Sequence, residues 1–218
     1  MCGILAYISN KDINQKKINI IKNLMKCRGP DNQSYKKFIF GRKNLHLFHS
    51  RLSIQDLNKR SNQPYLYRNY ILIFNGEIYN FKELKKKINL KFKTFSDTEV
   101  ILHYFNLYKE KCFKFFEGMW SIVIYDLKNE KIIVSRDRFG EKPLLIYRKN
   151  NELILSSQIS YINEILEFNQ KFNNNKINTF LHYGYKSLFK NEETFFKNID
   201  YLEKGNIFII NKDLKDRK

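Results

Sequence analysis

MWSIVIYDLKNEKIIVSRDRFGEKPLLIYRKNNELILS (Met119–Ser156) says most about the architecture of this 218-residue chain. The segment holds four short apolar runs separated by turn residues such as Asn, Asp, Gly and Pro. So few residues separate the runs that a crossover helix does not fit between most of them, which favours antiparallel strands that follow one another directly. The runs are Met119–Asp126, Lys131–Arg136, Leu144–Arg148 and Leu153–Ser156.

Outside this segment, strand-like and helix-like patterns come in blocks. Further strands are predicted at Cys2–Ser9, Leu45–Ser53, Tyr70–Asn75 and Asn206–Ile210. Apolar residues at helical spacing predict helices at Ile13–Cys27, Phe81–Ile88, Asp97–Tyr108, Gln158–Leu166 and Asn175–Tyr185. This order does not repeat as regular βαβ units. We therefore expect a layered α+β fold.

The composition indicates one compact domain over residues 1–218. Hydrophobic residues make up 43% of the chain, and only three prolines occur, so no Pro-rich linker divides it. The net charge of +18 is spread along the chain, with its densest part at Lys82–Lys93, which favours solvated surfaces over a nucleic-acid site. Nucleic acid is therefore an unlikely partner.

Cysteine usage and hydropathy indicate a cytoplasmic protein. The three cysteines form neither a CxxC pair nor an even disulfide framework, and the first residues lack the features of a signal peptide. No run approaches the roughly 18 apolar residues of a membrane span.

The four histidines lack metal-ligand spacing, so no metal is predicted. Cys27 and Cys112 are expected to be buried and inert.

Cys2 directly follows the initiator Met. Its small side chain should permit removal of Met1, which would leave a thiol and an α-amine on one residue. The amine could take the thiol proton and later protonate a leaving amine. Taken alone this is weak evidence, because a Cys at position 2 is more often an incidental small residue opening a strand.

Seven ordered motifs make the catalytic interpretation specific. Together they resemble class II glutamine amidotransferase domains, and most closely those of glutamine-hydrolysing asparagine synthetases, because of the forms RGPD and NGEIYN. The resemblance extends from Cys2 to about Ile210. The motifs are CGILAYI (Cys2–Ile8), RGPD (Arg28–Asp31), HSRLSI (His49–Ile54), FNGEIYN (Phe74–Asn80), SDTEVI (Ser96–Ile101), FEGMWSIVIYD (Phe116–Asp126) and RDRFGEKPL (Arg136–Leu144).

The resemblance implies an N-terminal nucleophile hydrolase fold, a four-layer αββα sandwich of two antiparallel sheets. It implies that Cys2 attacks the side-chain amide of L-glutamine, and that the Asn75 side chain and the Gly76 N–H stabilise the oxyanion. Asn75-Gly76 is also a strong hairpin signal. The residues after it have helical spacing, however, so we expect a strand to end there without a partner strand following.

The same resemblance implies a binding site for the α-carboxylate and α-ammonium of glutamine. It assigns the carboxylate to Arg51, a pocket lining to Leu52, Ser53, Ile54 and Gln55, and the ammonium to Glu77 and Asp97. Sequence physics alone would make Arg51 a surface arginine and Glu77 a first-turn acid. It would also make Ser96–Glu99 a capping box. Arg28 and Asp31 are interpreted as braces of a turn and left out of the site.

The resemblance also bears on what surrounds the domain. The related enzymes continue into an ATP-dependent synthetase domain, which is expected after residue 218 and has no counterpart within these residues. The domain itself should need no cofactor, while ATP and Mg²⁺ would serve the synthetase domain or a separate subunit that converts aspartate to asparagine. Open alternatives are an amidotransferase acting on a cell-surface sugar or peptide, a non-catalytic regulatory module, and a homodimeric assembly.

Overall fold

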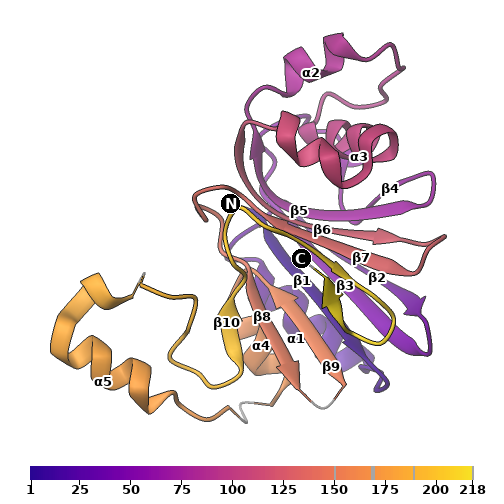
Figure 1. Cartoon of the computed structure of the whole chain (residues 1–218). Helices are drawn as coiled ribbons and strands as arrows, with labels where there is room; N and C mark the ends of the chain where they lie inside the picture. Colours follow the sequence, from indigo (N-terminus) through magenta and orange to yellow (C-terminus); the bar gives the residue numbers. More distant parts are fainter. Residues whose placement is uncertain (150, 168–169, 189, 218) are drawn as a thin grey trace.

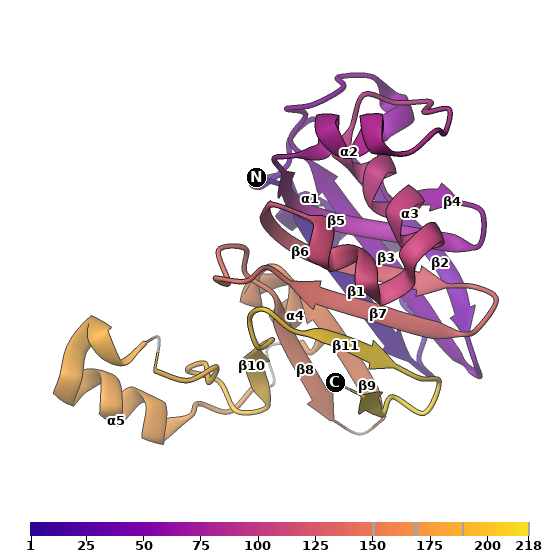
Figure 2. The same ribbon diagram turned by 45° about the horizontal axis from the view of Figure 1, so that its top comes forward.

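A computed structural model describes residues 1–149, 151–167, 170–188 and 190–217. Its strands form two stacked six-stranded sheets in which every pair of neighbours is antiparallel (Figures 1 and 2). The first sheet has the order β10-β8-β9-β1-β3-β2 and the second β12-β11-β7-β6-β5-β4. The strands of the first are β1 (Gly3–Ser9), β2 (Asn32–Phe40), β3 (Lys43–Arg51), β8 (Leu145–Lys149), β9 (Glu152–Ser156) and β10 (Ile199–Tyr201). Those of the second are β4 (Tyr65–Tyr67), β5 (Tyr70–Ile78), β6 (Gly118–Asp126), β7 (Lys131–Arg136), β11 (Ile207–Ile210) and β12 (Asp216–Arg217).

Helices cover the outer faces of both sheets (Figure 1). One buried apolar cluster lies between the sheets and joins side chains such as Ile4 of β1 and Val123 of β6. A second packs α2 (Phe81–Lys87) and α3 (Asp97–Tyr108) on the β4–β7 side, and a third packs α1 (Gln15–Met25) and α4 (Ile159–Ile165) on the β1–β9 side. The result is the expected αββα sandwich, in which alternate strand residues serve different clusters.

Local sequence explains where the main helices begin. The side chain of Asn14 accepts a hydrogen bond from the N–H of Lys17 at the start of α1. Ser96 likewise accepts from Thr98 N–H at the start of α3. Such caps satisfy N–H groups that have no partner within the helix. The expected capping box is only half formed, because Glu99 accepts from the N–H groups of residues 93 and 94 instead of returning to Ser96.

The structure corrects three expectations. β5 does not end at Asn75 but continues to Ile78, and Gly76 pairs with Trp120 inside the sheet. Strands β2, β4, β10 and β12 were not expected; β2 was missed because its polar sequence lacks a clean alternation. Cys27 is exposed, whereas Cys112 is buried as predicted.

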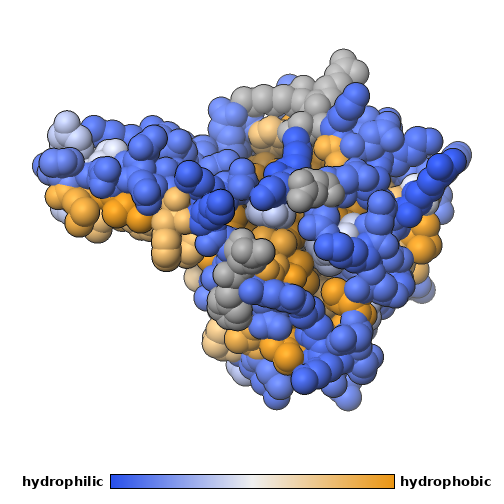
Figure 3. Space-filling model, turned by 90° about the horizontal axis from the view of Figure 1, so that it is seen from below, coloured by the Kyte–Doolittle hydropathy of each residue, from blue (hydrophilic) through white to orange (hydrophobic). Residues whose placement is uncertain are grey.

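The segment around α5 (Asn174–Tyr183) projects from the sandwich (Figures 1 and 2). Its exposed side chains include Leu181 and Tyr183, and Figure 3 shows apolar residues along one side of the projection. Lys176 stabilises the segment internally, since its buried Nζ donates to the carbonyl of Ser187 at 3.2 Å and to Asn191 Oδ1 at 2.8 Å.

Within the described residues, no helix is long and apolar enough to cross a membrane.

Candidate active site

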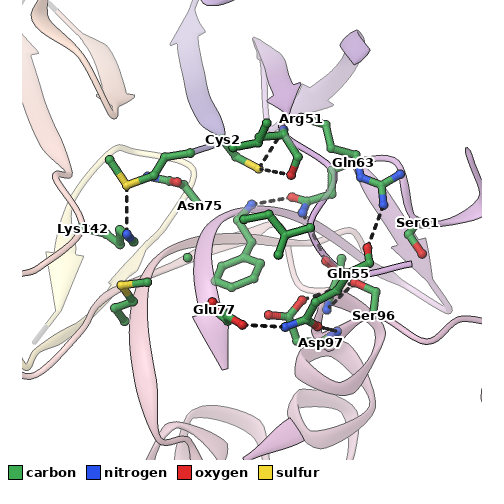
Figure 4. A pocket seen from close by; sticks show the side chains of 17 residues that line it. Cys2, Arg51, Gln55, Ser61, Gln63, Asn75, Glu77, Ser96, Asp97 and Lys142 are labelled. Atoms are coloured by element: carbon green, nitrogen blue, oxygen red, sulfur yellow. Dashed lines mark hydrogen bonds between the residues drawn. The ribbon is translucent and has the colours of Figure 1, made fainter. Parts of the chain in front are cut away.

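One pocket collects almost all of the residues that the sequence singles out (Figure 4). It lies where the start of β1, the end of β3, the second half of β5 and the start of α3 meet. The exception is Ser53, which does not line the pocket and donates its N–H to Asp31 Oδ2 at 2.6 Å. The expected residues that do line it are Cys2, Arg51, Leu52, Ile54, Gln55, Asn75, Gly76, Glu77 and Asp97.

Cys2 is held at one end of this pocket by the main chain. Its Sγ lies 3.5 Å from the N–H of Leu52 and 3.8 Å from the carbonyl oxygen of the same residue. Burial is the largest effect on the Cys2 thiol and raises its pKa, which the Leu52 hydrogen bond partly offsets. A base that removes the thiol proton is therefore needed for nucleophilic attack near neutral pH.

Arg28, which was left out of the predicted site, does not line the pocket but contacts the backbone of Cys2. Its Nε donates to the carbonyl oxygen of Cys2 at 2.9 Å and thereby fixes the backbone of that residue. The adjacent Gly29 lies so close to the sheet that a Cβ would fall 2.3 Å from the carbonyl carbon of Ser50. The RGPD motif thus brings a guanidinium against Cys2 because glycine permits this close approach.

Asn75 and Gly76 lie on β5 beside Cys2. The Asn75 side chain is 1% exposed, and neither its Nδ2 nor its Oδ1 has a hydrogen-bond partner in the described part of the chain. An unsatisfied buried amide costs roughly 1–3 kcal/mol of stability, so a group that faces a pocket in this state is suited to a ligand. Gly76 admits no side chain, since a Cβ would lie 2.1 Å from the Met119 carbonyl oxygen.

Arg51 is only 6% exposed and braces the loop that follows β3. Its two terminal nitrogens donate to the carbonyls of Gln55, Asp56 and Asn58 and to the side-chain oxygen of Asn62. A guanidinium has five N–H donors. These four contacts therefore leave Nε as the remaining donor, together with the positive charge at the pocket wall.

Two carboxylates and one amide close the opposite end of the pocket. Glu77 Oε1 accepts from Gln55 Nε2 at 3.1 Å, and Gln55 Oε1 accepts from the N–H of Asp97 at 3.3 Å. Asp97 Oδ2 accepts from the Ile78 N–H at 3.0 Å. Burial raises the pKa of Asp97 to about 6, and the nearby Glu77 adds to the shift. The two acids form a negatively charged end suited to an ammonium group.

The pocket wall also contains residues that were not assigned to the site from the sequence, among them Ser61, Gln63 and Lys142. Gln63 orders β5 by accepting from the Phe74 N–H at 2.6 Å and donating to Thr98 at 3.2 Å. Ser61 also lines the pocket. Lys142 contributes a buried ammonium. Its place in the RDRFGEKPL motif was the available signal, but no pattern in the sequence indicated that its side chain lines the same pocket as Cys2.

Possible metal ligands and the histidine nearest the pocket also bear on the chemistry of this site. Within the described residues, no cluster of His, Cys, Asp or Glu has the arrangement of a metal site. His49 is fully buried behind the pocket, with Nε2 3.2 Å from the Phe74 carbonyl oxygen. Burial lowers the pKa of His49 to about 3, so its ring is neutral at physiological pH.

Comparison with known proteins identifies the family of this domain. The pattern of the glutamine amidotransferase domain matches residues 1–218. A candidate glutamine-hydrolysing asparagine synthetase of Methanocaldococcus jannaschii is 39% identical over 193 residues, which are 81% of this chain and 38% of that protein. Asparagine synthetase 2 of Bacillus subtilis is 35% identical over 234 residues, and the match covers 100% of this chain and 30% of that protein. The chain thus spans about a third of these relatives' length.

Solved structures show the same fold at low sequence identity. An allosteric regulatory enzyme of purine biosynthesis superposes with a TM-score of 0.72 at 16% identity, covering 100% of this chain and 49% of that one. Glutamine phosphoribosylpyrophosphate amidotransferase of B. subtilis gives a TM-score of 0.65, also at 16% identity and with the same coverage. These matches agree with the two antiparallel sheets and flanking helices described above.

Proposed function

The chain belongs to the glutamine amidotransferase domain family, and on that premise we propose that it releases ammonia from L-glutamine with Cys2 as the nucleophile. The observation that carries the proposal is the unsatisfied Asn75 amide, which lines the same pocket as the Cys2 thiol. Glu77 and Asp97 at the opposite end supply the charge that an amino-acid ammonium requires. The pocket thus offers partners for both ends of the substrate.

The proposed reaction begins once Met1 has been removed. The α-amine of Cys2 takes the thiol proton, and Sγ attacks the side-chain carbonyl carbon of glutamine. Asn75 Nδ2 and the Gly76 N–H donate to the resulting oxyanion. The protonated α-amine returns its proton to the leaving nitrogen, so that ammonia departs and a γ-glutamyl thioester remains. Water then cleaves the thioester to give glutamate and the free thiol.

The substrate backbone is proposed to bind at the carboxylate end and the Arg51 side of the pocket. Glu77 and Asp97 would face the α-ammonium. Arg51 would attract the α-carboxylate through its charge and its remaining N–H, while its other donors keep the loop of Leu52–Asn58 in place. Since Arg51 serves both loop and ligand, glutamine binding would be coupled to the order of this loop.

The acceptor of the ammonia is proposed to be an activated aspartate. The names of the related proteins support this, because both relatives described above are designated as asparagine synthetases. The synthetase portion, with its ATP and Mg²⁺, would lie outside these residues, in the same protein or in a separate subunit. A sugar or peptide acceptor is the alternative. Assaying this domain together with the proposed synthetase portion, with glutamine, ATP and aspartate present, for asparagine formation decides between them.

The glutaminase proposal is tested by intact-mass analysis before and after incubation with a diazoketone analogue of glutamine, beside a Cys2→Ala variant. We expect a mass without Met1 and one adduct that maps to Cys2 and is absent from the variant. Exposed Cys27 serves as an internal comparison for non-specific alkylation. A folded, processed protein whose Cys2 stays unmodified would contradict the proposed nucleophile.

A further inference from the structure

Lys142 is a buried cation without a matching anion. Its side chain lies in the pocket wall and the residue is 6% exposed. Its Nζ lies 2.9 Å from Sδ of Met1, and a thioether is only a weak hydrogen-bond acceptor. Within the described residues Lys142 forms no ion pair. Burying an uncompensated ammonium costs stability, so this arrangement calls for a reason.

Hydrogen bonds to the side chains of Asp137 and Arg136 hold the backbone around Lys142 in place. Asp137 accepts from the N–H groups of Trp120, Phe139, Glu141 and Lys142 at 2.9 to 3.2 Å. The carbonyl of Lys142 accepts from Arg136 Nε at 2.9 Å. The loop between β7 and β8 therefore fixes the backbone of Lys142, whose side chain lines the pocket. Figure 4 shows Lys142 on the side of the pocket where Asn75 lies, with its ammonium against the Met1 thioether.

Removal of Met1 would change what the ammonium faces. The Met1 side chain spans from the residue before Cys2 to Nζ of Lys142. Standard bond lengths then place Nζ within about 10 Å of the nitrogen that becomes the α-amine of mature Cys2. After processing, the thioether is gone, and the two nitrogen groups share one end of the pocket.

We propose that Lys142 is a positioning residue for the reaction: its ammonium disfavours protonation of the Cys2 α-amine and so keeps that amine in the free-base form at neutral pH. The inference rests on the proposed function, in which this amine must accept the thiol proton. Two like charges in a poorly solvated pocket repel, so the cost falls on the group that can lose its proton more easily.

Four other charged groups lie around the pocket or against Cys2, and their effects on the α-amine differ in sign. Arg28 donates to the Cys2 carbonyl and Arg51 to the loop after β3, so both are hydrogen-bonded cations that add to the effect. Glu77 and Asp97 lie at the opposite end. Their negative charges oppose the effect, and Asp97 raises the pKa of the thiol.

The negative charges beside Lys142 itself come from the preceding loop. Asp137 is engaged by four backbone N–H groups, and Glu141 is exposed. Burial lowers the pKa of Lys142, while Glu141, Asp137 and Glu77 raise it. An uncharged Lys142 could then act as the base in place of the α-amine. Substitution by Arg separates these roles, because a guanidinium stays protonated in proteins.

The test measures the titration of the α-amine directly, by competitive acylation of the Met1-processed protein across pH and mass spectrometry of the N-terminal peptide. Lys142→Met should raise the midpoint by about one pH unit, as expected for a charge roughly 10 Å away at an intermediate dielectric. Lys142→Arg should retain the wild-type midpoint. Lys128→Met removes an exposed charge at the far end of the β6–β7 hairpin and should change nothing.

Glutaminase activity supplies the second measurement. The acidic limb of kcat/KM should move upward with the amine midpoint in Lys142→Met, with a five- to tenfold loss near pH 7 and recovery near pH 9, as about one pH unit implies. Lys142→Gln gives a second neutral variant if Lys142→Met does not fold. Unchanged midpoints in a folded neutral variant overturn the inference, and so does loss of all activity in Lys142→Arg. If the wild-type protein has no Cys2-dependent activity, the proposed function fails instead, while the amine titration still reports on Lys142.

Discussion

The two ends of the pocket differ in how far their polar groups are already satisfied. At the end of Glu77 and Asp97, Gln55 joins both residues and the Ile78 N–H holds the Asp97 carboxylate. At the end of Cys2, the amide of Asn75 has no partner within the described residues, and the ammonium of Lys142 meets only a thioether. The first end is organised for the α-ammonium charge that glutamine already carries before it reacts. At the second end, the Asn75 amide and the Lys142 ammonium can still donate hydrogen bonds to charge that forms during the reaction.

This difference connects structure to catalysis. A donor that is unsatisfied in the free protein gains most from charge that develops during the reaction, because it gives up no existing hydrogen bond. A carboxylate pair that is already hydrogen-bonded contributes mainly to binding. Substitutions at the Cys2 end should therefore change kcat, and those at the Glu77 end should change KM.

Asn75→Ala should produce the largest effect, a fall in kcat of about 100- to 1,000-fold with little change in KM, as expected for the loss of one oxyanion donor. The free energy of unfolding should be retained or increased, because the Asn75 amide has no hydrogen-bond partner that its removal would leave unsatisfied. Steady-state ammonia release and thermal unfolding provide the two measurements. A kcat within tenfold of the wild-type value would remove Asn75 from the proposed oxyanion site.

Asp97→Asn should act on the other end and raise KM for glutamine by about 30- to 100-fold, the range for a buried charge contact that loses its partner. Its amide oxygen can still accept from the Ile78 N–H. Because burial raises the pKa of Asp97 to about 6, the ionised carboxylate is disfavoured in the folded protein. The neutral variant should therefore unfold at the same or a higher temperature. A purely structural Asp97 would instead lower the unfolding temperature.

The pH dependence of KM gives a smaller and more selective effect. Asp97 is ionised above pH 6 and becomes protonated as the pH falls through about 6, at which point it ceases to attract an ammonium. We expect KM to rise toward tenfold per pH unit below this value. The same titration should stabilise the folded protein slightly at acidic pH. In Asp97→Asn the KM profile should become flat between pH 5 and 7, and an unchanged slope would assign it to another group.

Much of the fold could be predicted because hydrophobic periodicity is local. The bounds of β7 and α3 agree with those expected from the sequence alone. β2 was missed because Lys36 and Lys37 interrupt its pattern at the exposed edge of the sheet, where pairing with β3 stabilises the strand. Pairing partners are supplied by tertiary structure, and they can override a polar sequence.

The site was predictable as a set of motifs but not as a set of contacts. Family resemblance identified Cys2 and Asn75, whereas the contact of Arg28 with Cys2 and any role of Lys142 were not predicted. Their contacts cross 26 and 141 positions of the chain, to Cys2 and Met1 respectively. Arg51 shows the same limit, because its donation to the loop carbonyls depends on a backbone path that no spacing rule gives.

Gln55→Met should give the smallest effect. It distinguishes the contribution of the two carboxylates to KM from that of the Gln55 side chain that joins them. The substitution keeps the length of the side chain but removes its hydrogen bonds to Glu77 and to the N–H of Asp97. Since both acids remain, we expect KM to rise only about five- to tenfold, which corresponds to roughly 1–1.4 kcal/mol, the range of an ordinary hydrogen bond. Ser53→Ala is the matched control, because it lies on the same loop but not in the pocket wall. If Gln55→Met raised KM as much as Asp97→Asn, the amide itself would be the principal ligand, and the ground-state end of the pocket would depend on Gln55 more than on its two acids.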